Sequence, residues 1–409
     1  MTSLSELRGV ERAVVYKSGV RAATLERRPN AVAFQYEPDY LAAGGQAVAT
    51  SLPLGEERLV THSAGALPPF FAGLLPEGRR LHLLRSALKT SADDELSLLL
   101  AVGADTVGDV QVIPEHVALP DEVQPTLLVE DWATVRFREF LVRSAGGAMG
   151  VDRVALPGVQ DKVSARMINL PVARRGERFF LKLDPPEFPH LVVNEMFFLR
   201  AARQSGLETA EAELVRDGEG VPGLLVRRFD RRADATGRVR ARAQEDACQV
   251  LKRYPADKYR VTTEAVIEAL VDLCRARPVA ALALIRQVAF AYLSCNGDAH
   301  AKNFSIFARP DGEWRVTPAY DLPSSYPYGD VTMALSLNGR TREDIGRRDF
   351  LALAEAVRVR PRAVETALDA LVAGVDRWIG GLNELPFDAG RIRKLRRAIE
   401  YRRDRLRER

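Results

Sequence analysis

The sequence predicts an α+β fold, and three observations support that prediction. Strand-like segments fill the first part of the chain, at residues 12–16, 31–36 and 47–53. Apolar and aromatic runs typical of buried strands recur at residues 179–183 and 223–227. Amphipathic helical patterns then dominate the second half, and they lie at residues 264–273, 279–293, 350–356, 363–379 and from 391 onward.

Length and composition indicate a soluble globular protein of several units. A chain of 409 residues, 46% apolar and 28% charged, can form two or three cooperating units with substantial cores. Three scattered cysteines without metal-ligand spacing indicate a reducing cytoplasm. The charged N-terminus is no signal peptide, and a broken longest apolar run predicts no membrane span. The expected domains are 1–115 (β-rich), 116–145 (connection and helix), 146–243 (α/β) and 244–409 (helical).

Several helices and connections are expected before the middle of the chain. Residues 68–78 should open a helix that continues through residue 88, and acidic residues 93–95 should start a second helix favourably. The glycine-rich residues 102–109 do not suit a regular helix. A proline-containing acidic connection at 114–125 marks a boundary, and a helix is predicted over 132–144.

Lys182 lies inside the strand-like segment Phe-Phe-Leu-Lys-Leu. A lysine in a buried strand is costly unless an anionic group meets it. It could be an edge-strand lysine that reaches water with its ammonium group, or the kinase strand lysine that contacts nucleotide phosphates. We favour the second interpretation. Glu195, on a predicted helix at 194–202, could pair with Lys182 or could be a simple first-turn charge.

The chemistry of the chain centres on residues 295–307, where a polar loop follows an apolar helix and precedes a β-hairpin. Asn303 lies five residues after Asp298, and Asp321 follows beyond the hairpin. Phosphoryl transfer requires one Asp to accept or orient a hydroxyl proton, and an Asn and a second Asp to hold Mg²⁺. These residues could instead satisfy a turn and cap a segment, but the hairpin and the third group favour a kinase.

A basic C-terminal segment carries ten Lys or Arg residues against three acidic residues between 391 and 409. It could meet a phosphate backbone or an acidic partner. It could also be a solvated amphipathic helix, which we favour, with a buried stripe of Ile392, Leu395, Ile399 and Leu406.

Two sets of motifs resemble one known family. Gly-Asp-Ala-His-Ala-Lys-Asn-Phe-Ser-Ile-Phe and Thr-Pro-Ala-Tyr-Asp-Leu are similar to the catalytic core of HipA-type serine/threonine kinase toxins. Phe-Ala-Gly-Leu-Leu-Pro-Glu-Gly and Val-Gly-Ala-Asp-Thr-Val-Gly are similar to the N-terminal subdomain of that family. The resemblance spans nearly the whole chain. It implies a bilobal protein-kinase-like fold, with an α/β N-lobe, an all-helical C-lobe and an extra N-terminal β-rich subdomain.

The resemblance also implies roles for individual residues. Asp298 corresponds to the catalytic base, and Asn303 and Asp321 correspond to the Mg²⁺ ligands. A Gly-x-Gln-x-Lys segment covers the nucleotide phosphates in this family and corresponds to Gly158, Gln160 and Lys162. The residues assigned to ATP binding are Pro157, Gly158, Val159, Gln160, Asp161, Lys162, Lys182, Arg227, Phe229, His300, Lys302, Asn303, Tyr320 and Asp321.

The chain departs from the family pattern at two positions. Ala155 stands where the family often has a serine whose autophosphorylation displaces the phosphate loop, so this form of self-inactivation is not expected. Arg227 replaces the Glu of the usual Glu-Arg-Phe-Asp-Arg segment, a change that backbone recognition of adenine would survive. His300 is expected to support the loop, because a positioned Asp requires no histidine base.

The expected partners follow from the same resemblance. They are a small HipB-type DNA-binding antitoxin, operator DNA reached through the antitoxin complex, and a protein substrate in translation such as an aminoacyl-tRNA synthetase. Two alternatives remain open. One is a catalytically weak scaffold that holds an antitoxin on operator DNA, and the other is a kinase for a small molecule or lipid. Retention of Lys182, Asp298, Asn303 and Asp321 argues against the scaffold.

Overall fold

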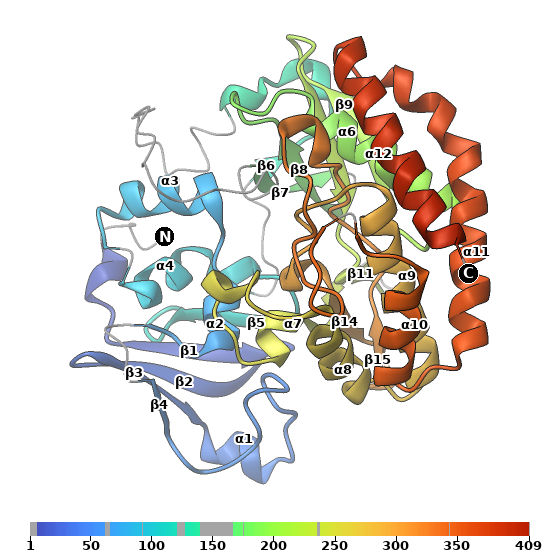
Figure 1. The fold of residues 1–409 in the computed structure, drawn as a ribbon. Helices are drawn as coiled ribbons and strands as arrows, with labels where there is room; N and C mark the ends of the chain where they lie inside the picture. Colours follow the sequence, from blue (N-terminus) through green and yellow to red (C-terminus); the bar gives the residue numbers. More distant parts are fainter. Residues whose placement is uncertain are drawn as a thin grey trace.

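A computed structural model of the protein describes residues 6–61, 66–91, 93–120, 127–139, 167–174, 176–234, 238–342 and 344–408. Figure 1 shows the N-terminal sheet on one side of the molecule, a second sheet above, and the C-terminal helices along the opposite side. Sheets that are antiparallel except for one strand pair, together with segregated helices, confirm the predicted α+β class. None of the helices in these ranges is long and apolar enough to cross a membrane.

The first sheet is antiparallel, in the strand order β4-β3-β2-β1-β5. Ser18 and Gly19 join the first two strands with φ values of 50° and 82°, the positive φ that a two-residue hairpin turn needs to match the strand twist. The strands are β1 (Arg12–Lys17), β2 (Val20–Arg28), β3 (Ala31–Tyr36), β4 (Leu59–Thr61) and β5 (Val110–Pro114).

Two details of this sheet differ from the sequence prediction. Residues 47–53 do not form a strand: Ala49 and Leu52 make one isolated bridge. The Tyr36 hydroxyl holds this turn by accepting from Val48 N (2.9 Å) and donating to Leu52 O (2.5 Å). Strand β2 was not predicted, because its residues 22–25 are buried on both faces and show no alternation.

Short helices cover the first sheet and contribute to its apolar core. The helix predicted from residue 68 to residue 88 is wrong, since two helices form with Leu74, Leu75, Pro76 and Glu77 between them. Pro76 lacks the backbone N–H that a continuous helix requires. The elements are η1 (Glu6–Gly9), α1 (Pro38–Ala42), α2 (Pro69–Gly73), α3 (Gly78–Leu88), α4 (Glu95–Val102) and η2 (Gly103–Asp105).

The second sheet has the order β6-β7-β8-β10-β9, with β6 parallel to β7 and the other pairs antiparallel. Helix α6 (Leu191–Gln204) packs on one face of this sheet. The predicted helix at 132–144 is wrong at its start, because η3 (Trp132–Thr134) ends before a new helical turn at Phe137. The strands are β6 (Leu127–Leu128), β7 (Ile168–Arg174), β8 (Glu177–Leu183), β9 (Ala212–Arg216) and β10 (Pro222–Arg227).

A small three-stranded sheet, β13-β14-β15, carries the loop that the sequence singled out. The expected helical domain from residue 244 begins with a strand, because residues 244–246 pair with β14. The predicted hairpin is present as β14 and β15. The elements of this region are β11 (Arg231–Ala233), β12 (Val239–Ala241), β13 (Gln244–Asp246), α7 (Ala247–Val250), η5 (Pro255–Asp257), η6 (Ala301–Asn303), β14 (Ser305–Ala308) and β15 (Trp314–Val316).

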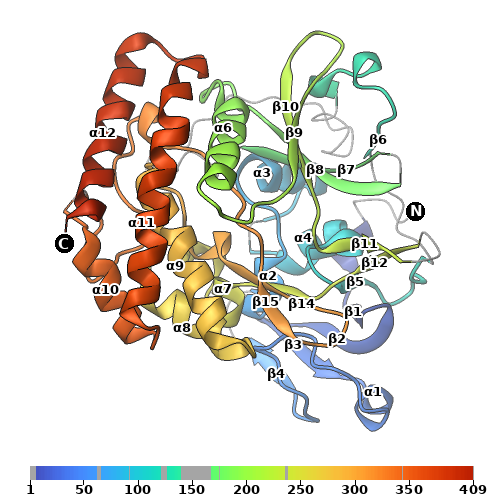
Figure 2. The same ribbon diagram turned by 90° about the vertical axis from the view of Figure 1, so that its right-hand side faces the viewer.

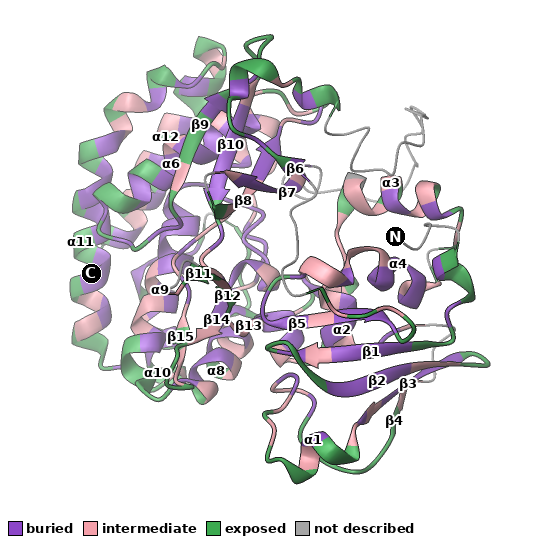
Figure 3. Ribbon diagram, turned by 180° about the vertical axis from the view of Figure 1, so that it is seen from behind, coloured by how far each residue is buried: buried purple, intermediate pink, exposed green. Residues whose placement is uncertain are grey.

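The remaining helices form the second core. Helix α9 is buried along most of its length, while α11 and α12 lie side by side at the outer edge of the molecule (Figure 2). Figure 3 shows buried and exposed faces alternating along α11. The predicted stripe of α12 is buried, which confirms the amphipathic-helix interpretation. The elements are α8 (Thr263–Leu273), α9 (Arg277–Leu293), η7 (Tyr326–Tyr328), α10 (Arg347–Ala356), α11 (Pro361–Trp378), η8 (Ile379–Glu384) and α12 (Ala389–Arg407).

Candidate active site

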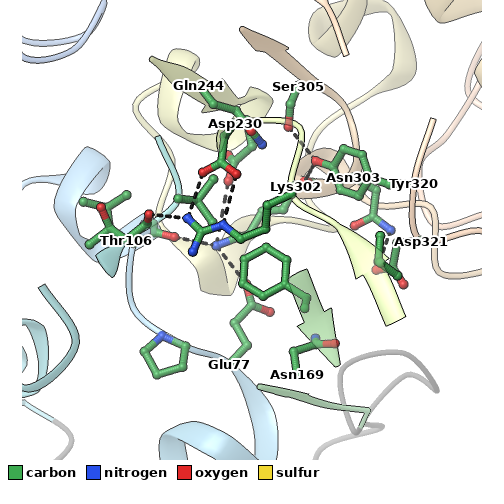
Figure 4. Close-up of a pocket in the computed structure, with 18 of the residues that line it drawn as sticks. Glu77, Thr106, Asn169, Asp230, Gln244, Lys302, Asn303, Ser305, Tyr320 and Asp321 are labelled. Atoms are coloured by element: carbon green, nitrogen blue, oxygen red, sulfur yellow. Dashed lines mark hydrogen bonds and ion pairs between the residues drawn. The ribbon is translucent and has the colours of Figure 1, made fainter. Parts of the chain in front are cut away.

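A cavity of about 310 Å³ opens where the two sheets and the β13-β14-β15 region meet. The second sheet contributes Asn169, Phe180 and Lys182 to its wall. Asn303, Tyr320 and Asp321 line the facing side, as Figure 4 shows. The N-terminal unit supplies a third wall, formed by Gly73, Leu74, Leu75, Pro76, Glu77, Arg80, Val102, Asp105, Thr106 and Val107.

Lys182 is buried in the middle of β8 and bound by two carboxylates. Its Nζ lies 2.7 Å and 2.9 Å from the two oxygens of Glu195 on α6, and 3.0 Å from Oδ1 of Asp321. Burial alone would lower the pKa of Lys182, but the charges of Asp321 and Glu195 outweigh it and raise the pKa. The pairing predicted between Lys182 and Glu195 is confirmed, and the alternative of an edge lysine that reaches water is wrong.

Asp321 and Asn303 meet on the same side of the cavity. Asn303 Nδ2 lies 3.1 Å from Oδ2 of Asp321. Asp321 has a φ of 57°, in the left-handed region, which directs its carboxylate back toward Lys182 and Asn303. Burial raises the pKa of Asp321, but Lys182 has the larger combined effect and lowers it. A carboxylate that stays ionised beside an amide is suited to a hard cation.

Asp298 lies behind this pair in the loop after α9. Its side chain is 1% exposed, its main-chain N–H donates to Asn296 Oδ1 (3.0 Å), and its Oδ1 accepts from the Tyr259 hydroxyl at 2.5 Å. Asn303 Nδ2 also approaches Asp298 O, at 3.4 Å. Asp298 itself is not among the described residues that line the cavity. Asn303 thus contacts both Asp298 and Asp321, and Asp298 is the most buried of these three predicted residues.

His300 supports the loop as a neutral side chain. Its ring packs edge-on against Tyr259, with 5.1 Å between the ring centres. Burial and the nearby Lys258 charge lower the pKa of His300, so the ring is uncharged at neutral pH. Its Nδ1 is buried without a hydrogen-bond partner among the described residues. These contacts agree with a supporting position for His300.

Lys302 lines the cavity, but its ammonium group is held by the N-terminal unit. Nζ donates to Gly73 O at 2.9 Å and lies 2.9 Å from Glu77 Oε1. Asp246 Oδ2 is 3.8 Å away. Lys258 also pairs with Glu77. Figure 4 shows Glu77 and Lys302 pointing toward each other from opposite walls.

The segment after β10 forms another part of the cavity wall. Arg227 lines the cavity, while its exposed guanidinium pairs with Glu177 and with Glu211 (2.9 Å to the latter). Phe229 packs on Tyr320 with 5.8 Å between the ring centres. The Tyr320 hydroxyl donates to Lys302 O at 2.7 Å.

Sequence reasoning missed several residues of the site. Arg228 is 3% exposed and binds Asp230, Asp105 and the Thr106 carbonyl, which ties the wall after β10 to the N-terminal unit. Glu77 lies in the Phe-Ala-Gly-Leu-Leu-Pro-Glu-Gly motif, from which the sequence predicts no role in the site. No local pattern indicates the contacts of Arg228 with Asp105 and Thr106 or those of Glu77 with the two lysines, since these contacts join residues more than a hundred positions apart in the chain.

The predicted phosphate loop lies outside the described residues. This applies to Pro157, Gly158, Val159, Gln160, Asp161 and Lys162, and to the departure at Ala155.

A buried strand lysine paired with a helix glutamate, facing an Asp-x-x-x-x-Asn loop and a later aspartate, is typical of protein-kinase-like folds. Among solved structures, Shewanella oneidensis HipA in complex with HipB and operator DNA matches with a TM-score of 0.72 and 23% identity. That match covers 96% of this chain and 97% of the other. The overall fold is therefore the bilobal fold of HipA, with its additional N-terminal β-rich unit.

Sequence comparisons agree with the structural match. Residues 154–379 match the HipA-like C-terminal domain, and residues 13–113 match the HipA N-terminal domain. The chain is 32% identical over 353 residues to the putative kinase Y4mE of Sinorhizobium fredii, covering 79% of this chain and 81% of the relative. It is 28% identical over 305 residues to the serine/threonine-protein kinase toxin HipA of S. oneidensis, covering 68% and 67%. The chain belongs to the HipA family of kinases.

Proposed function

We propose that the protein is an ATP- and Mg²⁺-dependent serine/threonine protein kinase and the toxin of a HipA/HipB-type toxin–antitoxin pair. The observation that carries this proposal is the convergence of Lys182, Asn303 and Asp321 on one cavity, with Asp298 held directly behind them. Lys182, Asp298 and Asp321 are charged groups with little access to water, an arrangement that costs folding free energy and is typical of functional sites.

Lys182 and the acidic pair provide the electrostatic part of the reaction. Lys182, kept in place by Glu195, would contact the nucleotide phosphates. The oxygens of Asn303 and Asp321 would hold Mg²⁺, which neutralises phosphate charge when bound. Asn303 and Asp321 fit this cation because their side chains lie within hydrogen-bond distance of each other and each carries an oxygen that can coordinate a metal ion.

Asp298 would accept the proton of the attacking serine or threonine hydroxyl as that oxygen bonds to the γ-phosphorus and ADP leaves. The hydrogen bond from Tyr259 fixes the carboxylate orientation. The proposed ATP site is completed by the segment with Gly158, Gln160 and Lys162, and by the main chain of Arg227 with Phe229 and Tyr320. The proposed domain limits remain 1–115, 116–145, 146–243 and 244–409.

The proposed partners come from the relatives. S. oneidensis HipA was solved with HipB and operator DNA. We infer that this chain is likewise held by a small DNA-binding antitoxin and reaches operator DNA through it. Three buried free cysteines, Cys248, Cys274 and Cys295, fit a reducing cytoplasm. The proposed substrate is a protein of translation, such as an aminoacyl-tRNA synthetase.

Transfer of labelled phosphate from ATP to proteins of a bacterial lysate tests the function. The wild-type protein should label a discrete protein band on serine or threonine, and Asp298→Asn should abolish labelling while ATP binding persists. Asp321→Ala should also weaken Mg²⁺-dependent ATP binding. Near-normal turnover by Asp298→Asn would contradict the proposed base.

The same assay separates the alternative functions. ATP binding without transfer to protein, sugar or inositol acceptors would favour a scaffold that holds an antitoxin on operator DNA. Phosphate found only on a small molecule or lipid head group would replace the protein-kinase proposal.

A further inference from the structure

The catalytic loop is the segment after α9 that carries Asp298 and Asn303, and the N-terminal unit is the first sheet with the short helices that cover it. The carboxylate of Glu77 anchors this loop on the N-terminal unit. Glu77 Oε1 lies 2.9 Å from Lys302 Nζ, and Glu77 Oε2 pairs with Lys258 Nζ. The Lys302 ammonium group also donates to Gly73 O at 2.9 Å. Glu77 is the residue before α3, whereas both lysines belong to the lobe that carries the catalytic loop.

Each lysine lies beside a group of the proposed reaction. Lys302 immediately precedes Asn303. Lys258 immediately precedes Tyr259, whose hydroxyl donates to Asp298 at 2.5 Å, and Lys258 O accepts from Ala301 N at 3.1 Å. Glu77 therefore bridges the two chain segments that hold the proposed base and the proposed metal ligand.

The charges around the bridge require an anion at this position. The side chains of Lys258 and Lys302 are only 8% and 13% exposed, and His300 next to them is neutral. Asp246 is the other nearby carboxylate, and its 3.8 Å distance to Lys302 is longer than that of Glu77. Burial would raise the pKa of Glu77, but the charges of Lys302 and Lys258 outweigh it and hold the pKa well below its usual range.

The segment that leads to Glu77 is held in place where α2 ends. Helix α2, which ends at Gly73, docks on α7 through a hydrogen bond from Gln249 Nε2 to Phe70 O at 3.0 Å. A Cβ at Gly73 would lie 2.8 Å from Gln249 Cγ, so the two helices approach closely because this residue is glycine. The segment that carries Glu77 thus starts from a fixed point on the catalytic lobe.

We propose that Glu77 is a positioning residue for phosphoryl transfer, through which the N-terminal unit holds Asp298 and Asn303 in their reactive arrangement. This inference rests on the proposed kinase function and extends it, because it makes the N-terminal unit part of the active site. Glu77 acts through Lys258 and Lys302. Its removal therefore alters the geometry of the loop more than the affinity for ATP.

The first test is the kinetics of Glu77→Gln in the full-length protein, which keeps the side-chain shape and removes the charge. We expect kcat to fall on the order of 10²-fold, as small displacements of reacting groups do, with the KM for ATP within about threefold of wild type. Glu77→Asp keeps the charge and should recover part of kcat. In Lys302→Met, the added Glu77→Gln change should cost less than it costs alone.

A matched control is Thr50→Val, which breaks another contact between the N-terminal unit and the catalytic lobe. Thr50 Oγ1 donates to Glu245 Oε2 at 2.6 Å, and Glu245 lies on β13 opposite Ile306 of β14. This variant should keep kcat within about twofold of wild type, as expected for a change outside the catalytic geometry. Equal losses in Glu77→Gln and Thr50→Val, in proportion to any loss of folded protein, would overturn the inference.

Hydrogen exchange provides a readout that is independent of kinase activity. The amides of His300, Ala301 and Asn303 donate to main-chain oxygens at 2.8, 3.1 and 2.9 Å. They should exchange faster in Glu77→Gln than in wild type or Thr50→Val. Unchanged exchange would overturn the positioning inference even if the kinase is active. Faster exchange in Glu77→Gln, together with a wild-type protein that shows no transfer activity, would support the positioning of the loop and contradict the proposed kinase.

Discussion

Replacing Glu195 by glutamine tests whether the buried charges around Lys182 stabilise the fold as their geometry implies. Lys182 Nζ has contacts of 2.7 and 2.9 Å to Glu195 and 3.0 Å to Asp321, and the Glu195 side chain is 1% exposed. Glutamine keeps the size and one acceptor oxygen but removes the negative charge.

The expected loss in the free energy of unfolding depends on which partners Lys182 keeps after the change. Breaking a buried ion pair by removing one partner costs about 3–5 kcal/mol. Asp321 still faces Lys182 after the change, so we expect the lower end, about 3 kcal/mol of the free energy of unfolding. The ammonium of Lys182 should also move toward Asp321, which would weaken ATP binding.

Urea denaturation of wild type and Glu195→Gln measures the loss, and Glu213→Gln is the matched control. The Arg174–Glu213 pair has a distance of 2.9 Å, but 55% of the Glu213 side chain is exposed. Exposed pairs contribute about 0–1 kcal/mol. A loss in Glu195→Gln no larger than in Glu213→Gln would refute the argument from buried charge.

Three further changes have distinct expected outcomes. Tyr259→Phe should lower the transfer rate on the order of tenfold, because Asp298 loses the hydrogen bond that orients it, and an unchanged single-turnover rate would contradict this. Asp230 is buried, but Arg228 and Arg231 lower its pKa to about 2. The stability that this carboxylate provides should thus be complete above its unfolded pKa of about 4 and be lost as the pH falls through about 2. The gap in melting temperature between wild type and Asp230→Asn should shrink over that range, and a constant gap would argue against the assignment. Arg402 donates to Tyr292 O (2.8 Å) and Val331 O (2.7 Å), so Arg402→Met should cost about 1–3 kcal/mol in urea denaturation, and a neutral change would show that these carbonyls find other donors.

Sequence patterns were sufficient where the determinants are local. The hairpin after Asn303 and the helices of the second half are specified by alternation, turn residues and helical periodicity. The predicted pairing of Lys182 with Glu195 succeeded for a related reason, since the two residues lie on a strand and on the next helix. The α+β class followed from the same patterns.

Where distant parts of the chain meet, local patterns were insufficient. Glu77 and Lys302 lie in the first and the last of the expected domains, and no sequence motif links the two positions, so their contact could not be predicted. Strand β2 was missed because burial on both faces removed its alternation. Residues 47–53 were misassigned because the Tyr36 hydroxyl satisfies their backbone in place of a neighbouring strand.

The left-handed backbone of Asp321 bears on how this enzyme could lose activity during evolution. With a φ of 57°, the position suits Asn, Asp and Gly, while most other side chains would strain the backbone. Asparagine is one nucleotide change away from aspartate and nearly identical in shape. If Asp321 holds Mg²⁺ as proposed, the substitution that removes activity with the least change in shape is therefore also the one that best preserves the fold. A lineage that retained the fold but abandoned catalysis would be expected to carry asparagine here.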